Sequence, residues 1–122
     1  MTRFVNLTSH EIRLYTGNAD DAYYDKRAHY WITIDPEPIP ARVDQWTDTA
    51  EWIGGIRTLT VHIRGTMGLP DPEPGVIYIT SSLIARNVIR RDVVAPDTDY
   101  LPIVDEYGKL YAVRRFKRWV ME

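Results

Sequence analysis

Val76-Ile77-Tyr78-Ile79-Thr80-Ser81-Ser82 is the stretch that decides the fold of this chain. Its first four residues are β-branched or aromatic without a polar interruption, which is typical of a strand covered on both faces. One of the two serines then offers the side-chain oxygen that favours the start of a helix. Apolar residues recur at helical spacing from Leu83 onward, so we predict a helix that ends near Arg90 or Arg91.

Short β-prone runs precede this unit. Residues 4–7 and 12–15 are predicted to form a hairpin-like pair that opens the domain, and residues 30–34 read as a further strand. Three prolines at alternate positions then follow, at Pro36, Pro38 and Pro40. Because proline fixes φ and lacks a backbone donor, we expect a loop or an edge segment there.

Gly54-Gly55 marks a second hairpin, since two glycines supply the positive φ angles of a tight turn. The flanking strands are predicted at residues 41–50 and 56–64. In the second of these, the alternation places Leu59, Val61 and Ile63 on one face, which we predict to be buried. Residues 69–75 are too rich in proline for regular structure and predict a stiff connector.

The last third of the chain predicts more strands, at residues 92–96, 103–104 and 110–119. Residues 105–108, Asp-Glu-Tyr-Gly, are a turn signal because Gly108 can adopt a left-handed conformation. The expected fold is therefore a single α+β domain spanning residues 1–122, with a mostly antiparallel sheet and one principal helix packed on it.

Composition excludes several classes of protein. The chain has no cysteine, which removes disulfides, thiolate metal sites and a cysteine nucleophile. No apolar run approaches the roughly 20 residues of a membrane span, and the first residues do not resemble a secretory signal. With a net charge of −2, a double-stranded nucleic acid partner is not expected. We expect a cytoplasmic protein without a membrane partner.

Three segments carry a family resemblance. They are the opening Val5-Asn6-Leu7-Thr8-Ser9-His10, the centre with Tyr78-Ile79-Thr80-Ser81 and Arg91-Asp92-Val93-Val94-Ala95-Pro96, and the closing Asp105-Glu106-Tyr107-Gly108 hairpin. In these the chain resembles a widespread set of small, largely uncharacterised proteins from bacterial genomes and their phages. The resemblance implies a phage or mobile-element setting and no particular activity, cofactor or catalytic residue.

The predicted strand-to-helix turn is the sharpest candidate for a binding site. Ser81 and Ser82 stand beside the backbone N–H groups that a helix leaves unpaired at its start, where phosphate or carboxylate groups bind. Arg86 lies one turn further on, and Arg91 is a second basic candidate. The alternative is that a serine only caps the helix.

A second candidate cluster lies near the N-terminus. Asn6, Thr8 and His10 are spaced by two residues, so an extended chain would project them from one face toward a ligand. The alternative is that Asn6 and Thr8 satisfy backbone groups where the first strand ends.

Catalytic and metal motifs are weak. His10, His29 and His62 are far apart in the sequence and match no metal-binding spacing, so no metal and no cofactor are expected. A serine–histidine–aspartate triad would have to combine Ser81, His10 and Asp92. Ser81 lacks the G-x-S-x-G motif of a nucleophile elbow, and nothing in the sequence places the three residues together.

The sequence therefore favours a non-enzymatic binding protein for a small anionic or nucleotide-like ligand, acting as a phage or mobile-element accessory factor. Aromatic residues such as Tyr23, Tyr24 and Trp31 on the 17–39 segment are candidates for stacking on a planar ligand. One alternative is a protein-interaction or structural module that uses the basic C-terminal strand, with Arg114, and the proline-rich loops. A second alternative is a metal-independent hydrolase or nuclease. We also expect a homo-oligomer, because a small domain forms a shared cleft most easily between subunits.

Overall fold

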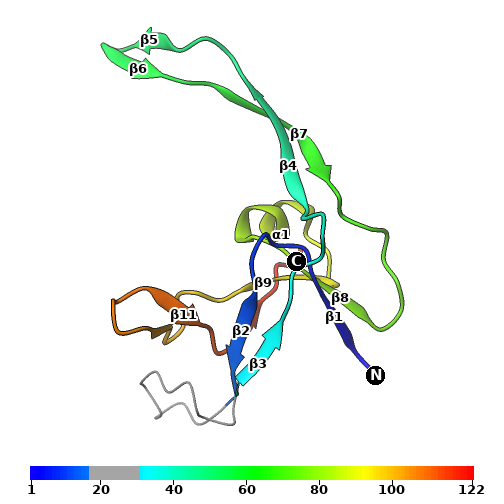
Figure 1. The fold of residues 1–122 in the computed structure, drawn as a ribbon. Helices are drawn as coiled ribbons and strands as arrows, with labels where there is room; N and C mark the ends of the chain where they lie inside the picture. The colour runs from blue at the N-terminus through cyan, green and yellow to red at the C-terminus, as the bar shows by residue number, and fades with distance from the viewer. Residues whose placement is uncertain (17–30) are drawn as a thin grey trace.

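A computed structural model describes residues 1–16 and 31–122 of the chain, as a body from which a two-stranded arm projects (Figure 1). In chain order the elements are β1 (Arg3–Asn6), β2 (Ile12–Tyr15), β3 (Trp31–Ile34), β4 (Arg42–Thr47), β5 (Glu51–Ile53), β6 (Ile56–Thr58), β7 (Val61–Met67), β8 (Val76–Ile79), α1 (Ser82–Val88), β9 (Val93–Pro96), β10 (Ile103–Val104), β11 (Leu110–Ala112) and β12 (Phe116–Lys117). Helix α1 is the only helix among the described residues, and its seven residues cannot span a bilayer.

The body is built on a four-stranded sheet with the order β1-β8-β9-β12. Strands β1 and β9 both run parallel to β8, and β12 is antiparallel to β9. Parallel neighbours need a crossover connection, and α1 supplies it between β8 and β9. The predicted buried strand is confirmed, since three of the four residues of β8 are buried.

Helix α1 begins as predicted but ends early. Ser81 is the N-cap, and its Oγ accepts a hydrogen bond of 3.4 Å from the backbone N–H of Ile84. The helix ends at Val88 rather than near Arg90, because Ile89 takes a left-handed conformation with φ of 49°. The N–H of Ile89 closes the last turn on the carbonyl of Ala85. Arg90 therefore lies beyond the helix.

The predicted hairpin between residues 4–7 and 12–15 is wrong. Strand β1 pairs with β8, whereas β2 pairs antiparallel with β3. Val5 buries its side chain in one cluster with residues of β8 and β9, a tertiary contact that a local hairpin does not offer. The intervening residues turn out of the sheet, and the backbone N–H of Leu7 bonds to the carbonyl of Ile79.

Strands β2 and β3 and the short pair β10–β11 pack against the body sheet. Ile79 and Val94 from the sheet meet Ile12, Leu14 and Val113 in one buried cluster. A smaller cluster surrounds Tyr15, Ile103 and Ala112. Because Ile79 is fully buried between these layers, it is a central residue of the core.

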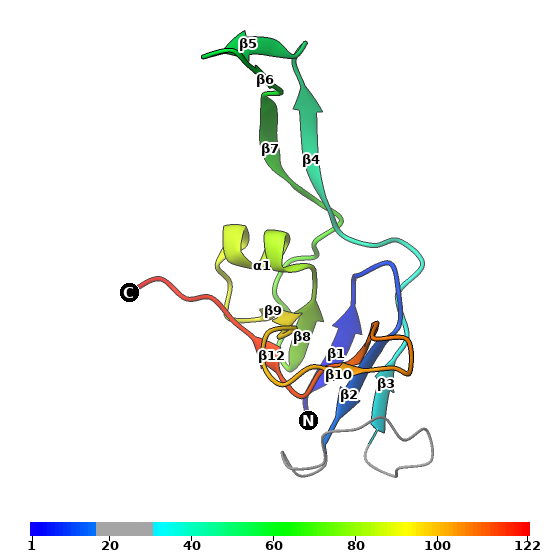
Figure 2. The same ribbon diagram turned by 90° about the vertical axis from the view of Figure 1, so that its left-hand side faces the viewer.

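The arm consists of β4 paired with β7 and of β5 paired with β6. The predicted turn is confirmed, since Gly54 and Gly55 both have positive φ angles, of 57° and 82°. Figure 2 shows the arm extending away from the body, with α1 near its base.

The predicted burial of Leu59, Val61 and Ile63 is wrong. These side chains are 55%, 45% and 59% exposed. Strand periodicity identifies residues that share a face, but it does not say whether another element covers that face. Here the strand belongs to a projecting arm, and no second layer from residues 1–16 or 31–122 covers that face.

The described residues are thus predominantly β, with mostly antiparallel pairing and one short helix. This agrees broadly with the predicted α+β class, although strands dominate. The turn at residues 105–108 is confirmed, because the N–H of Asp105 bonds to the carbonyl of Lys109 and Gly108 has a φ of 78°. The predictions for Tyr23, Tyr24 and His29 lie outside the described residues.

Candidate functional site

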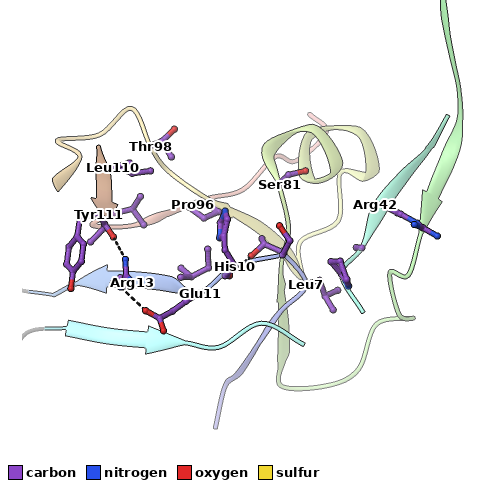
Figure 3. Close-up of a pocket in the computed structure, with 17 residues that line it drawn as sticks. Leu7, His10, Glu11, Arg13, Arg42, Ser81, Pro96, Thr98, Leu110 and Tyr111 are labelled. Carbon is purple, nitrogen blue, oxygen red and sulfur yellow. Dashed lines mark hydrogen bonds and ion pairs between the residues drawn. The ribbon is translucent and has the colours of Figure 1, made fainter. Parts of the chain in front are cut away.

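A cleft of about 820 Å³ lies where the loop after β1 meets the start of α1 and the end of β9 (Figure 3). Its lining is mainly apolar, with a few hydroxyl, imidazole and charged groups. The lining residues are Leu7, Thr8, Ser9, His10, Glu11, Ile12, Arg13, Pro40, Ala41, Arg42, Ser81, Pro96, Thr98, Leu110, Tyr111, Ala112 and Val113.

Asn6 lies beneath this cleft and holds its loop in place. Its side chain is 1% exposed and makes four hydrogen bonds. The Nδ2 donates to the carbonyls of His10 and Ile34, both at 2.9 Å, and the Oδ1 accepts from the N–H and the hydroxyl of Thr8. The backbone of Asn6 also joins the proline loop, since its carbonyl accepts from the N–H of Glu37. Asn6 is therefore a positioning residue in this structure.

The hydroxyl of Thr8 is also committed within the loop. Its Oγ1 lies 2.6 Å from Asn6 Oδ1 and 2.9 Å from the carbonyl oxygen of His10, and both are acceptors. A hydroxyl has one proton, so Thr8 has none left for a ligand. Thr8 shapes the wall of the cleft and can only accept a further hydrogen bond.

His10 and Ser81 retain groups that can reach a ligand. The loop is held through the backbone carbonyl of His10, and Figure 3 shows the imidazole projecting toward the side of the cleft formed by Pro96 and Ser81. Ser81 caps α1 with its oxygen as the acceptor. Its hydroxyl proton therefore stays free to donate.

The other predicted residues are not brought into the cleft. Ser82 is the exposed first residue of α1. Arg86 and Arg91 are also exposed, and neither lines the cleft. The geometry thus brings together Thr8, His10 and Ser81 and leaves the two arginines outside.

The charged residues of the cleft are ones that the sequence did not single out. Arg13 Nε lies 2.7 Å from Glu11 Oε1, and the guanidinium stacks 4.5 Å from the centre of the Tyr111 ring. The spacing of two between Glu11 and Arg13 on an extended segment was a usable signal for this pair. Tyr111 is almost a hundred residues away, and nothing local indicates its position. Arg42 lies on the rim, with its side chain directed away from His10 in Figure 3.

The triad of the hydrolase alternative is not assembled. Asp92 does not line the cleft, and its two carboxylate oxygens accept from Arg90 at 2.9 Å and 2.6 Å. This hydrogen bond lowers the pKa of Asp92 and raises the pKa of Arg90, against the opposing effect of burial on both. Arg90 also donates to the carbonyl of Pro70. The pair fixes the chain after α1.

His10 and His62 belong to no metal site in the described part of the chain. On the arm, His62 stacks on Trp46 with ring centres 4.0 Å apart and lies 2.7 Å from Asp48 Oδ2. Within residues 1–16 and 31–122 there is no group of three or more side chains that could hold a metal ion.

Basic residues of the C-terminal segment, which the interaction alternative used, bind Asp97. This carboxylate is 3% exposed and accepts from Arg115 Nε at 2.8 Å, while Lys117 Nζ lies 3.3 Å from its other oxygen. The hydrogen bond from Arg115 lowers the pKa of Asp97, and bonds from Lys117 and the backbone of Asp99 act in the same direction against desolvation. Arg115 and Lys117 therefore support the fold of this segment.

This cluster predicts a loss of stability in acid. A carboxyl group with a lowered folded-state pKa stabilises the fold at any pH above its unfolded-state pKa, and this contribution is lost as the pH falls through the folded-state value. Asp97→Asn should therefore lower the free energy of unfolding by about 1–2 kcal/mol at neutral pH. The difference from the parent protein should shrink toward about pH 3. Urea unfolding at both pH values measures it.

The matched control is Asp71→Asn. The Asp71 side chain is exposed and makes no ion pair with another described residue. Its charge contributes only the smallest of the effects that raise the pKa of Arg90, so its replacement should change the free energy of unfolding by less than about 0.5 kcal/mol at both pH values. An Asp97→Asn deficit that stays constant from neutral to acid pH would show that the charge on this carboxylate does not stabilise the fold.

Comparison with protein-family models, with curated proteins and with solved structures finds no match to this chain.

Proposed function

We propose that the chain binds a small anionic ligand, of the size of a nucleotide, in the cleft beside His10. The size of the cleft and its mainly apolar lining with a few polar groups support the proposal. The volume of about 820 Å³ falls within the range of small-molecule sites, and such sites combine apolar walls with a few convergent polar groups.

The donors suit an anion. The His10 ring and the Ser81 hydroxyl can both donate, and Thr98 and Ser9 add hydroxyl groups to the lining. Among the charged lining residues, Glu11 is neutralised by Arg13, so Arg42 on the rim gives the lining a net positive charge that attracts an anion at long range, while its side chain points away from His10.

One wall of the cleft is apolar and can contact the apolar part of a ligand. Leu7, Pro96 and Leu110 line the cleft together with Ala112. A flat or aliphatic group removed from water by this wall gains roughly 25 cal/mol per Å² of buried apolar area. The wall therefore favours an organic anion over a bare inorganic one.

A panel of inorganic phosphate and the four common nucleoside monophosphates tests the proposal. At least one nucleotide should raise the melting temperature in proportion to the logarithm of its concentration. Its affinity, measured by calorimetry, should fall about tenfold in His10→Ala, because a hydrogen bond to a charged group is lost. The variant keeps the backbone carbonyl that Asn6 and Thr8 use.

The matched control is His62→Ala, on the arm and outside the cleft. This variant should bind with the affinity of the parent protein. The proposal is overturned if no member of the panel shifts the melting temperature, or if the shift is the same in His10→Ala as in the parent.

A further inference from the structure

The arm, residues 42–67, carries a large exposed apolar surface. Eight of its large apolar side chains are between 42% and 69% exposed: Trp46, Trp52, Ile53, Ile56, Leu59, Val61, Ile63 and Met67. An isolated two-stranded hairpin is marginally stable in water, and monomers rarely expose large contiguous apolar patches. The surface therefore indicates a contact with another molecule.

The end of the arm has two chemically different faces. Glu51 is opposite Thr58 and Ile53 is opposite Ile56, so these four residues share one face, which we call the tip face. Trp52 and Arg57 lie on the other face, with the guanidinium 5.2 Å from the ring centre. The tip face thus carries two isoleucines, one threonine and one acidic residue, and no basic one.

A groove of about 480 Å³ lies between the base of the arm and α1, and we call it the arm-base groove. Its apolar lining consists of Val43, Ile63, Leu69, Leu83, Ile84 and Val88. Two charged residues, Arg64 and Arg90, complete the lining together with Gly65 and polar Thr66 and Asn87, and no acidic residue is among them. This groove shares no lining residue with the cleft beside His10.

Arg64 is the cation of this groove that an incoming acid can reach. Arg90 is already paired with Asp92. Arg64 is exposed, its guanidinium stands 5.7 Å from the Trp46 ring, and it makes no ion pair within the described part of the chain. An apolar groove with a free arginine is complementary in charge to a face that carries a glutamate.

The tip face cannot fill the groove of its own molecule. From Arg42 to Ile53 an extended chain spans up to roughly 40 Å at about 3.3 Å per residue. Figures 1 and 2 show this arm pointing away from α1, with β5 and β6 at the end far from that helix, whose residues line the groove. The occupant of the groove must come from another molecule.

We propose that this occupant is the tip face of a second copy of the chain. Two copies related by a two-fold axis then dock reciprocally, with their arms antiparallel and Glu51 of each next to the partner's Arg64. Such an interface is self-complementary and closed. The arm carries three basic and three acidic residues, so two arms do not repel each other: Arg42, Arg57, Arg64, Asp44, Asp48 and Glu51. Reciprocal docking also doubles the buried area toward the ~800 Å² per partner of a stable interface.

A charge-swap series, followed by sedimentation equilibrium, tests the pairing. The parent protein should be a dimer. Glu51→Arg and Arg64→Glu should each raise the dimer dissociation constant at least tenfold, because like charges then meet at both contacts. The double variant Glu51→Arg/Arg64→Glu should recover most of the parent affinity. Both residues are exposed, so none of these changes buries a charge in the free chain.

Glu73→Arg is the matched control, since Glu73 is exposed and lies outside the arm and the groove. It should dimerise like the parent. A parent protein that stays monomeric at every concentration would overturn the proposal and leave the surface to a different protein or a lipid interface. The proposal is also overturned if both single variants dimerise like the parent. The same holds if the double variant does not recover the affinity that the single variants lose.

Cysteine placement gives a second and independent measurement, because the chain has no cysteine of its own. Ile53→Cys protein mixed with Asn87→Cys protein should form mixed dimers with a short thiol-reactive cross-linker, since one residue lies on the tip face and the other lines the groove. Ile53→Cys mixed with Ile39→Cys, on the exposed proline loop, should not cross-link above background. Equal yields in the two mixtures would contradict docking of the tip in the groove.

Discussion

Asn6→Ala is expected to lower the free energy of unfolding by about 3 kcal/mol. The reason is that the variant removes a buried side chain that satisfies two backbone carbonyls, one amide and one hydroxyl. The carbonyl of Ile34 loses the Asn6 donor, the carbonyl of His10 keeps only the hydroxyl of Thr8, and the loop of the cleft loses its attachment to the end of β3. Urea unfolding measures the effect on stability, and ligand calorimetry should show a parallel loss of binding.

Asn87→Ala is the matched control for this change. Asn87 is exposed, and its side chain makes one hydrogen bond, to the carbonyl of Leu83 within its own helix. Its replacement should change the free energy of unfolding by no more than about 0.5 kcal/mol. Equal effects of the two substitutions would mean that the hydrogen bonds of Asn6 do not stabilise the loop.

Ile79→Ala is expected to lower the free energy of unfolding by about 4 kcal/mol. Ile79 is fully buried in β8, and its side chain lies in one cluster with its sheet neighbour Val94 and with Leu14 and Val113 of the layer packed on the sheet. A cavity at this position cannot collapse without separating the layers, so the cost should lie at the high end for such substitutions. Chemical denaturation measures it.

The control is Ile39→Ala, at a position that is 77% exposed. That substitution should be nearly neutral. A loss below about 1 kcal/mol in Ile79→Ala would contradict the two-layer core, because a well-packed aliphatic side chain costs more than that to truncate.

Local signals in the sequence predicted the central unit and the turns. The β-branched run before Ser81, the serine cap and Gly54-Gly55 each act through their own backbone geometry, which needs no distant partner. The early end of α1 was missed because Ile89 adopts a left-handed conformation that β-branched residues rarely take. Because the helix ends there, Arg90 lies beyond it and pairs with Asp92.

The sequence did not indicate which strands pair with each other. The run at residues 4–7 carries the pattern of a strand, but this pattern is equally compatible with a hairpin to residues 12–15 and with the parallel pairing to β8 that the structure has. The predicted burial of one face of the arm failed for a similar reason. The alternation there is that of a half-buried strand, while no layer among the described residues covers its apolar face.

The spacing of Asn6, Thr8 and His10 predicted side chains that project together toward a ligand. In the structure Asn6 turns inward to hold the loop and the hydroxyl of Thr8 is used within it, which is the alternative that assigned these two residues to local backbone groups. The long-range neighbours of His10, such as Ser81 and Tyr111, are brought close only by the sheet order. A single sequence carries no local signal for such contacts.

An NMR titration of ¹⁵N-labelled protein with a nucleoside monophosphate is the most direct test of the binding cleft. Saturable amide shifts should gather on residues 8–12, at Ser81 and on residues 110–113, while the tip of the arm, Trp52 to Arg57, stays unchanged. Shifts that do not saturate, or that concentrate on the arm, would contradict the assignment of the cleft beside His10 as the ligand site.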